Sequence, residues 1–214
     1  MNQSSYEIAC PCKGVLIIMF SILSAGLYVL SRYVWYGSYD WNDFSLFLMN
    51  KTLAFSAVIM LFLMSVIPFK LKANRSIVGI ITFYLLVAHI ILGLLLIPSE
   101  YFKVFFDETG MLKGRYGWAL FFGVLAFVTA IILQQGFYMK KSSNYPFSFF
   151  FRTGILVFFI ATLLHIALID PDFTYWNNPN KILIPVSGLA FVLLIMSFII
   201  GLIRRIRKYK KTGK

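Results

Sequence analysis

The chain has 214 residues, of which 60% are hydrophobic and only 13% are charged. Soluble domains are about half apolar and about a quarter charged, so a core of this size cannot bury all the apolar side chains, and a lipid environment is indicated. The net charge of +12 does not indicate nucleic-acid binding, because seven basic residues gather between Arg204 and Lys214, directly after an apolar run. Such a cluster is typical of a segment that contacts anionic lipid.

Six apolar segments are long enough for transmembrane helices, which need about 20 residues each. They span 14–36, 46–69, 76–98, 116–138, 149–169 and 182–203, and a basic tail follows at 204–214. The first segment is interpreted as a retained helix, because aromatic residues follow it and a small-residue cleavage site does not. The sequence therefore predicts an all-α integral membrane bundle of six transmembrane helices that forms one domain over residues 1–214.

Basic residues divide unequally between the two sides of this predicted bundle. If the carboxyl terminus is cytoplasmic, 14 basic residues lie on the cytoplasmic side and 6 on the other, whereas seven of the eight acidic residues lie on the outer side. Basic loops stay in the cytoplasm, so we expect both termini there, as an even number of helices also requires.

Two cysteines, Cys10 and Cys12, form a C-P-C stretch just before the first apolar segment. A pair this close does not make a disulfide framework. Reversible acylation and soft-metal binding both remain open, and two reduced thiols near the membrane surface are the simplest interpretation.

The chain has two histidines, His89 and His165, and both fall inside predicted membrane helices. Ionisable residues at that depth are rare and usually functional. At 1.5 Å per residue, His89 lies about 20 Å and His165 about 24 Å above the cytoplasmic start of its helix. Two neutral imidazoles at one depth on separate helices suit axial ligation of a haem iron, with the other ring nitrogen bonded to an oxygen acceptor.

Small residues lie on the same helix faces as the two histidines. Gly93 accompanies His89, and Gly154, Ala161 and Thr162 accompany His165. They could leave space for a flat macrocycle, but small residues also let membrane helices pack closely, and a histidine can bond across helices without a cofactor. From these residues alone, a haem site, a cofactor-free helix contact and a proton relay all remain open.

The run RSIVGIITFYLLVAH leads from Arg75 to His89, with Gly79 four residues and Phe83 eight residues after the arginine. This spacing resembles the ferric reductase-like transmembrane domain family, in particular the small bacterial branch that includes the haem-binding membrane subunit of the periplasmic methionine sulfoxide reductase system. Pro68 before this run and the basic turn at 139–141 are similar to that family as well, so the resemblance spans residues 46 to 170.

The resemblance implies one b-type haem with His89 and His165 as axial ligands. It also implies an electron-transfer subunit of an oxidoreductase, which passes electrons from a membrane quinol or a partner reductase to an outer-face acceptor. The family's inner histidine in the fifth helix is replaced by Arg152, so only the outer haem site is implied. Arg152 would contact a haem propionate, a lipid phosphate or a quinone, or would simply mark the cytoplasmic interface.

A different class of function stays open beside the redox interpretation. The protein could be a structural or assembly subunit, or a small transporter, that has lost the cofactor or never had it. A transporter favours broken helices and buried charges near the midplane, which the sequence does not show apart from the histidines. No glycine-rich phosphate loop indicates a flavin or nicotinamide domain.

Overall fold

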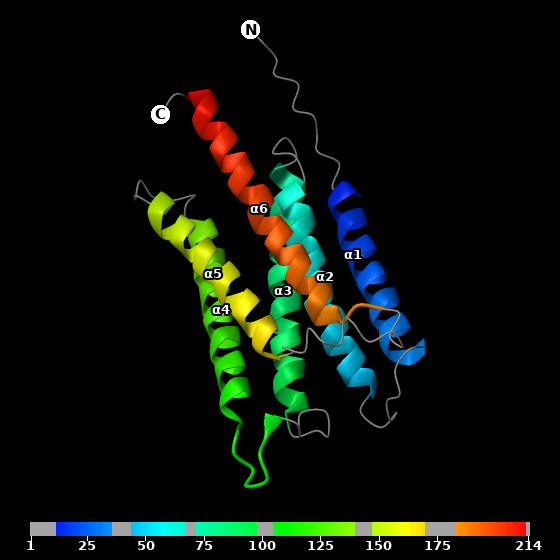
Figure 1. Ribbon diagram of the computed structural model, residues 1–214. Helices are drawn as coiled ribbons and strands as arrows, with labels where there is room; N and C mark the ends of the chain where they lie inside the picture. The colour runs from blue at the N-terminus through cyan, green and yellow to red at the C-terminus, as the bar shows by residue number, and fades with distance from the viewer. Residues whose placement is uncertain are drawn as a thin grey trace.

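A computed structural model describes residues 12–35, 44–66, 72–97, 105–139, 147–169 and 183–212. Nearly all of these residues are helical. The helices are α1 (Cys12–Leu30), continued by the π-helical segment η1 (Ser31–Trp35), α2 (Phe44–Val66), α3 (Lys72–Leu96), α4 (Gly114–Met139), α5 (Phe147–Ile169) and α6 (Val186–Thr212). Successive helices run in opposite directions, so α1 begins and α6 ends at the same end of the bundle (Figure 1).

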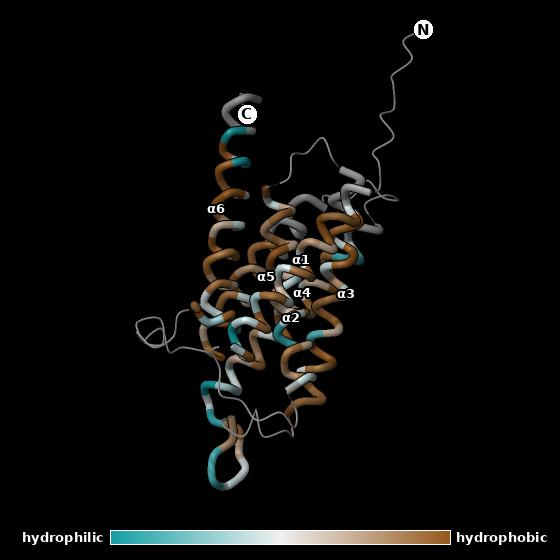
Figure 2. The backbone as a smooth tube through the Cα atoms, turned by 90° about the vertical axis from the view of Figure 1, so that its right-hand side faces the viewer, coloured by the Kyte–Doolittle hydropathy of each residue, from teal (hydrophilic) through white to brown (hydrophobic). Residues whose placement is uncertain are grey.

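Among the residues that the structure describes, five helices are long and apolar enough to cross a membrane. Their spans are Gly14–Trp35, Ser45–Val66, Ser76–Leu96, Gly114–Gly136 and Val186–Arg204, and α5 contributes a shorter apolar stretch, Thr153–Ile169. Large hydrophobic side chains are exposed along all of these helices, and hydrophilic residues concentrate near the ends of the bundle (Figure 2). Exposed apolar surface on this scale is stable in lipid and unfavourable in water, so the predicted all-α membrane architecture is confirmed at this level.

Both ends of the last helix differ from the predicted boundaries. The last helix begins at Val186, after Pro185, and continues to Thr212. The residues predicted as a separate tail are therefore helical to Thr212, since lysine and arginine are good helix formers.

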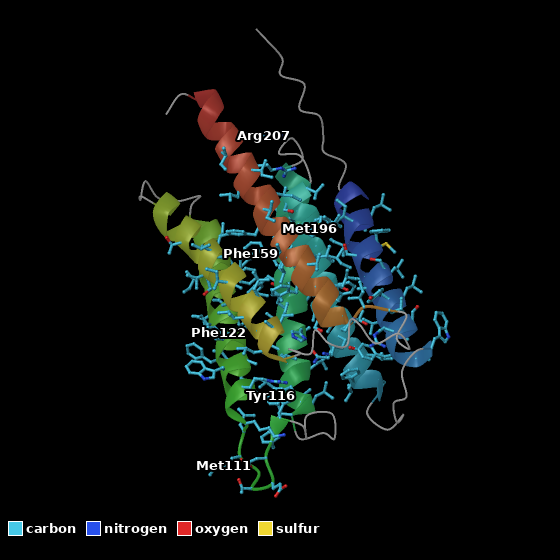
Figure 3. The ribbon with its side chains drawn as sticks, viewed as in Figure 1. Met111, Tyr116, Phe122, Phe159, Met196 and Arg207 are labelled. Atoms are coloured by element: carbon cyan, nitrogen blue, oxygen red, sulfur yellow. The ribbon has the colours of Figure 1, made fainter. Side chains whose placement is uncertain are left out.

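The ends of α2 and α6 are joined by a hydrogen bond. Arg204 of α6 donates from its guanidinium to the backbone carbonyl of Val66. The last carbonyls of a helix have no partner within the helix, so a basic side chain is a suitable cap for them. In Figure 3, Arg207 marks this end of the molecule, and Met111 and Tyr116 mark the other.

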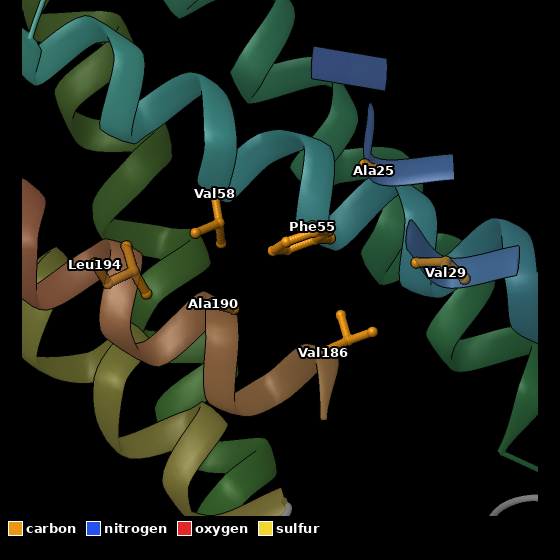
Figure 4. Packing of buried hydrophobic residues seen from close by; sticks show 7 residues of the cluster. All are labelled: Ala25, Val29, Phe55, Val58, Val186, Ala190 and Leu194. Atoms are coloured by element: carbon orange, nitrogen blue, oxygen red, sulfur yellow. The ribbon is translucent and has the colours of Figure 1, made fainter. Parts of the chain in front are cut away.

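The core has two parts. Side chains from α1, α2 and α6 form the first cluster, which consists of Ala25, Val29, Phe55, Val58, Val186, Ala190 and Leu194 (Figure 4). Side chains from α4 and α5 form the second, which consists of Ala126, Ala130, Phe158 and Ala161. Three alanines in the second cluster let the backbones of α4 and α5 approach closely.

Two antiparallel helix pairs position the histidines. The α2–α3 pair and the α4–α5 pair are each packed extensively, whereas α3 and α4 touch only sparsely. Phe83 and Leu86 of α3 pack against the α4–α5 cluster. His89 follows Leu86 by three residues, so it continues the side of α3 that faces the α4–α5 pair.

Candidate functional site

His89 of α3 is held by a single residue of α2. Its Nδ1 atom lies 2.5 Å from the side-chain oxygen Oδ1 of Asn50 and 3.2 Å from the backbone oxygen of the same residue. Asn50 is only 5% exposed, and a buried amide inside an apolar bundle is costly unless its polar atoms are paired. The contact therefore provides the buried amide of Asn50 with a hydrogen-bonding partner, and it also fixes the ring of His89.

His165 of α5 is held by the backbone of α4. Its Nδ1 atom lies 2.7 Å from the carbonyl oxygen of Ala119, a residue in the second turn of α4 that is almost fully buried. The ring can come this close because residue 123, one turn further along α4, is glycine. A Cβ atom built there would lie 2.8 Å from Nδ1 and 2.9 Å from Cε1 of His165, closer than real Cβ atoms approach.

These two contacts define the tautomer of each imidazole. A carbonyl oxygen can only accept a hydrogen bond, so Nδ1 of His165 carries the proton that it donates to Ala119. The same holds for His89 and the oxygens of Asn50. A neutral imidazole with its proton on Nδ1 has a lone pair on Nε2. Metal-bound histidines in proteins commonly show this arrangement, with the distal nitrogen donating to a carbonyl or carboxylate oxygen.

The two histidines lie near each other and near a lysine. His89, His165 and Lys51 are close enough for electrostatic interaction between their side chains. Lys51 directly follows Asn50 in α2, and its Nζ atom lies 5.4 Å from the centre of the Phe47 ring. Polar groups from α2, α3 and α5 thus share one region.

The predicted space beside His165 is occupied by helix packing. A Cβ atom at Gly154 would lie 3.1 Å from Cδ2 of Leu133 on α4, and Ala161 is buried in the α4–α5 cluster. Thr162 donates its hydroxyl hydrogen bond to the carbonyl of Phe158 in its own helix. These residues serve close contact between α4 and α5, which is one of the two alternatives that the sequence left open for them.

Gly93 likewise faces the neighbouring helix and not the other histidine. The nearest atom to a Cβ atom built there is Nδ2 of Asn50, at 3.9 Å. The glycine accommodates the amide that holds His89, since the two residues lie one turn apart on α3. Its role is local packing around His89.

Several residues singled out in the sequence lie outside the part of the chain that the structure describes in full. Arg75 belongs to α3, Arg152 to α5 and Cys12 to α1, but their side chains are not described. Cys10 and Pro68 fall outside the described ranges altogether. The proposed roles of Arg152 and the cysteines stay predictions.

Asn50 and Gly123 were not predicted from the sequence as parts of this site. Asn50 had a usable signal, because an amide in an apolar membrane segment is expected to have a hydrogen-bonding partner. Gly123 had none, since a glycine in a membrane helix is common and only the packing of α5 against α4 shows what it makes room for.

The described residues and the known protein families were both compared with this site. No group of three or more histidine, cysteine, aspartate or glutamate side chains gathers among the residues that the structure describes. No family model matches the chain, and no curated protein is significantly similar to it. The interpretation of this site therefore rests on the residues themselves.

Proposed function

We propose that the protein is a membrane-embedded b-type cytochrome, in which His89 and His165 are the axial ligands of one haem. The observation that carries this proposal is the matched bonding of both histidines. Each imidazole donates its Nδ1 proton to an oxygen of the preceding helix, to Asn50 in one case and to Ala119 in the other. In both rings this leaves Nε2 as the nitrogen that can bind iron.

The residues of the chain would supply position and environment for the group. Asn50 and the Ala119 carbonyl fix the orientation of the rings, and hydrogen bonding to Nδ1 makes Nε2 a stronger donor. Bound haem supplies one-electron transfer, with a potential set by axial ligands, burial and polarity. The proposed role is transfer from a membrane quinol or a partner reductase to an acceptor outside. The resemblance of residues 75–89 to the ferric reductase-like transmembrane domain supports this role.

Six membrane crossings and cytoplasmic termini form part of the proposal. The fifth helix has 23 residues, about 35 Å at 1.5 Å per residue, which is enough to cross the hydrocarbon core of about 30 Å. Both histidines then lie toward the outer side of what we propose to be a bacterial inner membrane. Reporter fusions after Lys70 and after Ser99 should report opposite compartments, and identical results would contradict this topology.

The experiment that tests the haem is a spectrum of the purified protein. The full chain, made in haem-replete cells and purified in mild detergent, should show a reduced-minus-oxidised b-type band and one haem per chain. Two haems per chain would show that another ligand exists. A stable, colourless protein would end the redox proposal.

A second candidate function is supported by the packing of α4 against α5. His165 already joins these helices through Ala119, and Gly154 and Ala161 are used in helix contact. A cofactor-free structural or assembly subunit would need no more than this. For such a protein, replacing either histidine would lower the thermal stability of a colourless bundle and would change no absorption band.

A further inference from the structure

A buried arginine lies at the end of the bundle opposite the start of α1. Arg32 belongs to η1, the π-helical turn that continues α1, and only 8% of its surface is exposed. Its Nε atom is buried and has no hydrogen-bond partner. A buried guanidinium with an unused donor is unfavourable, and single π-helical turns are frequent at functional sites.

The surroundings of Arg32 offer aromatic rings and no negative charge among the described residues. The guanidinium carbon lies 5.9 Å from the ring centre of Tyr33. Tyr28, one turn earlier, donates a 2.6 Å hydrogen bond to the carbonyl of Ile184, just before α6. The described acidic residues are Asp107 and Glu108, both exposed in the turn before α4.

The start of α6 adds further positive potential at this end of the bundle. Val186 opens α6 and packs in the same cluster as Val29, which lies one turn before Arg32. The first turn of α6 contains no acidic residue, and the positive end of the helix dipole lies at this end of the bundle. Figure 1 shows the end of α1 and the beginning of α6 at the same end of the molecule.

We propose that Arg32 is the centre of an anion site that binds a phosphate group. The planar guanidinium can present two parallel N–H donors to phosphate oxygens, and Nε is the donor that the folded chain leaves unused. Two sources have this chemistry at a membrane surface, namely the headgroup of an anionic phospholipid and free phosphate. The site is independent of the proposed haem, because it involves neither histidine nor their partners.

Arg115 provides a matched control at the same end of the bundle. It also lies over a tyrosine ring, with 4.6 Å between its guanidinium carbon and the ring centre of Tyr116. Unlike Arg32, Arg115 is exposed and donates a hydrogen bond of 2.8 Å to the hydroxyl of Tyr116. Replacing Arg115 removes the same charge from the protein without emptying a buried site.

The test uses the full-length protein in neutral detergent. Native mass spectrometry with added phosphatidylglycerol or phosphatidylcholine measures retained lipid, and thermal unfolding with inorganic phosphate or chloride at equal ionic strength measures free anion. We expect the anionic lipid or the phosphate to bind wild type and Arg115→Gln alike. For Arg32→Gln we expect binding at least about tenfold weaker, because a charge-assisted hydrogen-bonding pair is lost.

The outcomes distinguish a lipid headgroup from free phosphate, and they also show when the proposal fails. Selective retention of the anionic lipid identifies a headgroup, and stabilisation by phosphate without lipid retention identifies a free anion. If Arg32→Gln does not fold, Arg32→Lys decides, since it keeps the charge but lacks the planar fork and should bind several-fold less. Wild type that binds neither ligand, or variants of Arg32 and Arg115 that behave identically, would overturn the proposal.

Discussion

The α2–α3 pair and the α4–α5 pair each hold one histidine ring, but they do so with different groups. In each pair the second helix carries a histidine in its last turns, and the imidazole donates to an oxygen near the start of the first helix. The partners are separated by 39 residues in one pair and by 46 in the other. His89 uses the side chain of Asn50, whereas His165 uses the backbone of α4 at Ala119.

The difference determines which residues each histidine requires. A backbone carbonyl is present at every position, so the bond of His165 needs no particular side chain at 119. It needs instead the absence of one at Gly123, where a Cβ atom would occupy the space of the ring. The bond of His89 needs the side chain of Asn50, in an orientation that places its oxygen beside Nδ1 of the ring. One pair is therefore sensitive to addition of atoms and the other to their removal.

The largest expected effect comes from removing either ring. His89→Ala and His165→Ala should each abolish or severely reduce haem content, because one imidazole in an apolar site holds iron poorly. Arg152→Ala should leave the haem in place, since no ligand role is assigned to it. Haem content is measured as haem per chain after purification. Full haem content in either histidine variant would show that the two pairs do not act as equal partners.

The second-largest effect is expected when one methyl group is added to the α4–α5 pair. Gly123→Ala places a carbon 2.8 Å from Nδ1 of His165, so the ring must move and its bond to Ala119 is lost. We expect haem affinity to fall about 10- to 100-fold, the usual cost of losing the group that orients a metal-binding histidine. Haem transfer to apomyoglobin measures this affinity.

Gly117→Ala is the control for that substitution. It adds the same methyl group to the same helix, but the nearest atom there is Cδ2 of Leu112, at 3.7 Å, an ordinary contact. Equal losses from both substitutions would mean that the backbone of α4, and not the ring of His165, responds to the added carbon.

The fold was largely predictable from the sequence, because lipid imposes a simple rule. A membrane helix satisfies its backbone internally and is apolar over most of its surface, so composition alone locates the segments. The helix ends were less predictable. α6 continues through the basic residues to Thr212, since nothing before Gly213 breaks the helix and charge does not prevent it from extending beyond the membrane.

The site was predictable only in part, for a related reason. His89 and His165 were identified because ionisable groups are conspicuous in apolar segments. The small residues near them were compatible with a macrocycle or with close helix packing, and Gly154 and Ala161 pack against α4. Spacing shows which residues share a face of one helix, but not which neighbouring helix that face meets. Gly123 could not be identified for the same reason.

Removing the amide in the α2–α3 pair should have a smaller effect than adding the methyl group in the other pair. In Asn50→Ala the backbone oxygen of residue 50, now 3.2 Å from Nδ1, can still accept the proton of His89. We expect haem to be retained with affinity lowered several-fold and up to about tenfold.

The midpoint potential provides the second measurement on this variant. A weaker acceptor makes the imidazole a poorer donor to ferric iron, so the potential should rise. Asn50→Asp, which keeps an acceptor oxygen at the same place, should not raise it. An unchanged potential in Asn50→Ala would mean that the side chain does not tune the ligand and that both pairs rely on backbone oxygens.

The smallest effect is expected at the turn that leads into the α4–α5 pair. One carboxylate oxygen of Asp107 accepts hydrogen bonds from the hydroxyl of Thr109 at 2.6 Å and from the backbone N–H groups of Thr109 and Met111, both at 2.9 Å. Gly110 completes the turn with a positive φ of 79°, a conformation that suits glycine. The ring of Phe105 then stacks on Tyr116 in the first turn of α4, with 4.0 Å between centres.

Asp107→Ala tests whether the position of His165 in the α4–α5 pair depends on the turn before α4. The Thr109 hydroxyl, followed by the Met111 amide, holds the pKa of Asp107 below its usual value. A lowered pKa means that the carboxylate stabilises the turn fully above the ordinary aspartate pKa and loses this effect as the pH falls through the folded-state value. Between pH 5 and 8 the wild-type turn should therefore be equally ordered. In the variant, hydrogen exchange at the Met111 amide should be faster throughout that range, while the haem band and the exchange of the buried turns around Ala119 stay unchanged. A shifted haem band would show that the position of His165 depends on the turn, and that the α4–α5 pair is less independent of its connecting segments than the backbone bond at Ala119 implies.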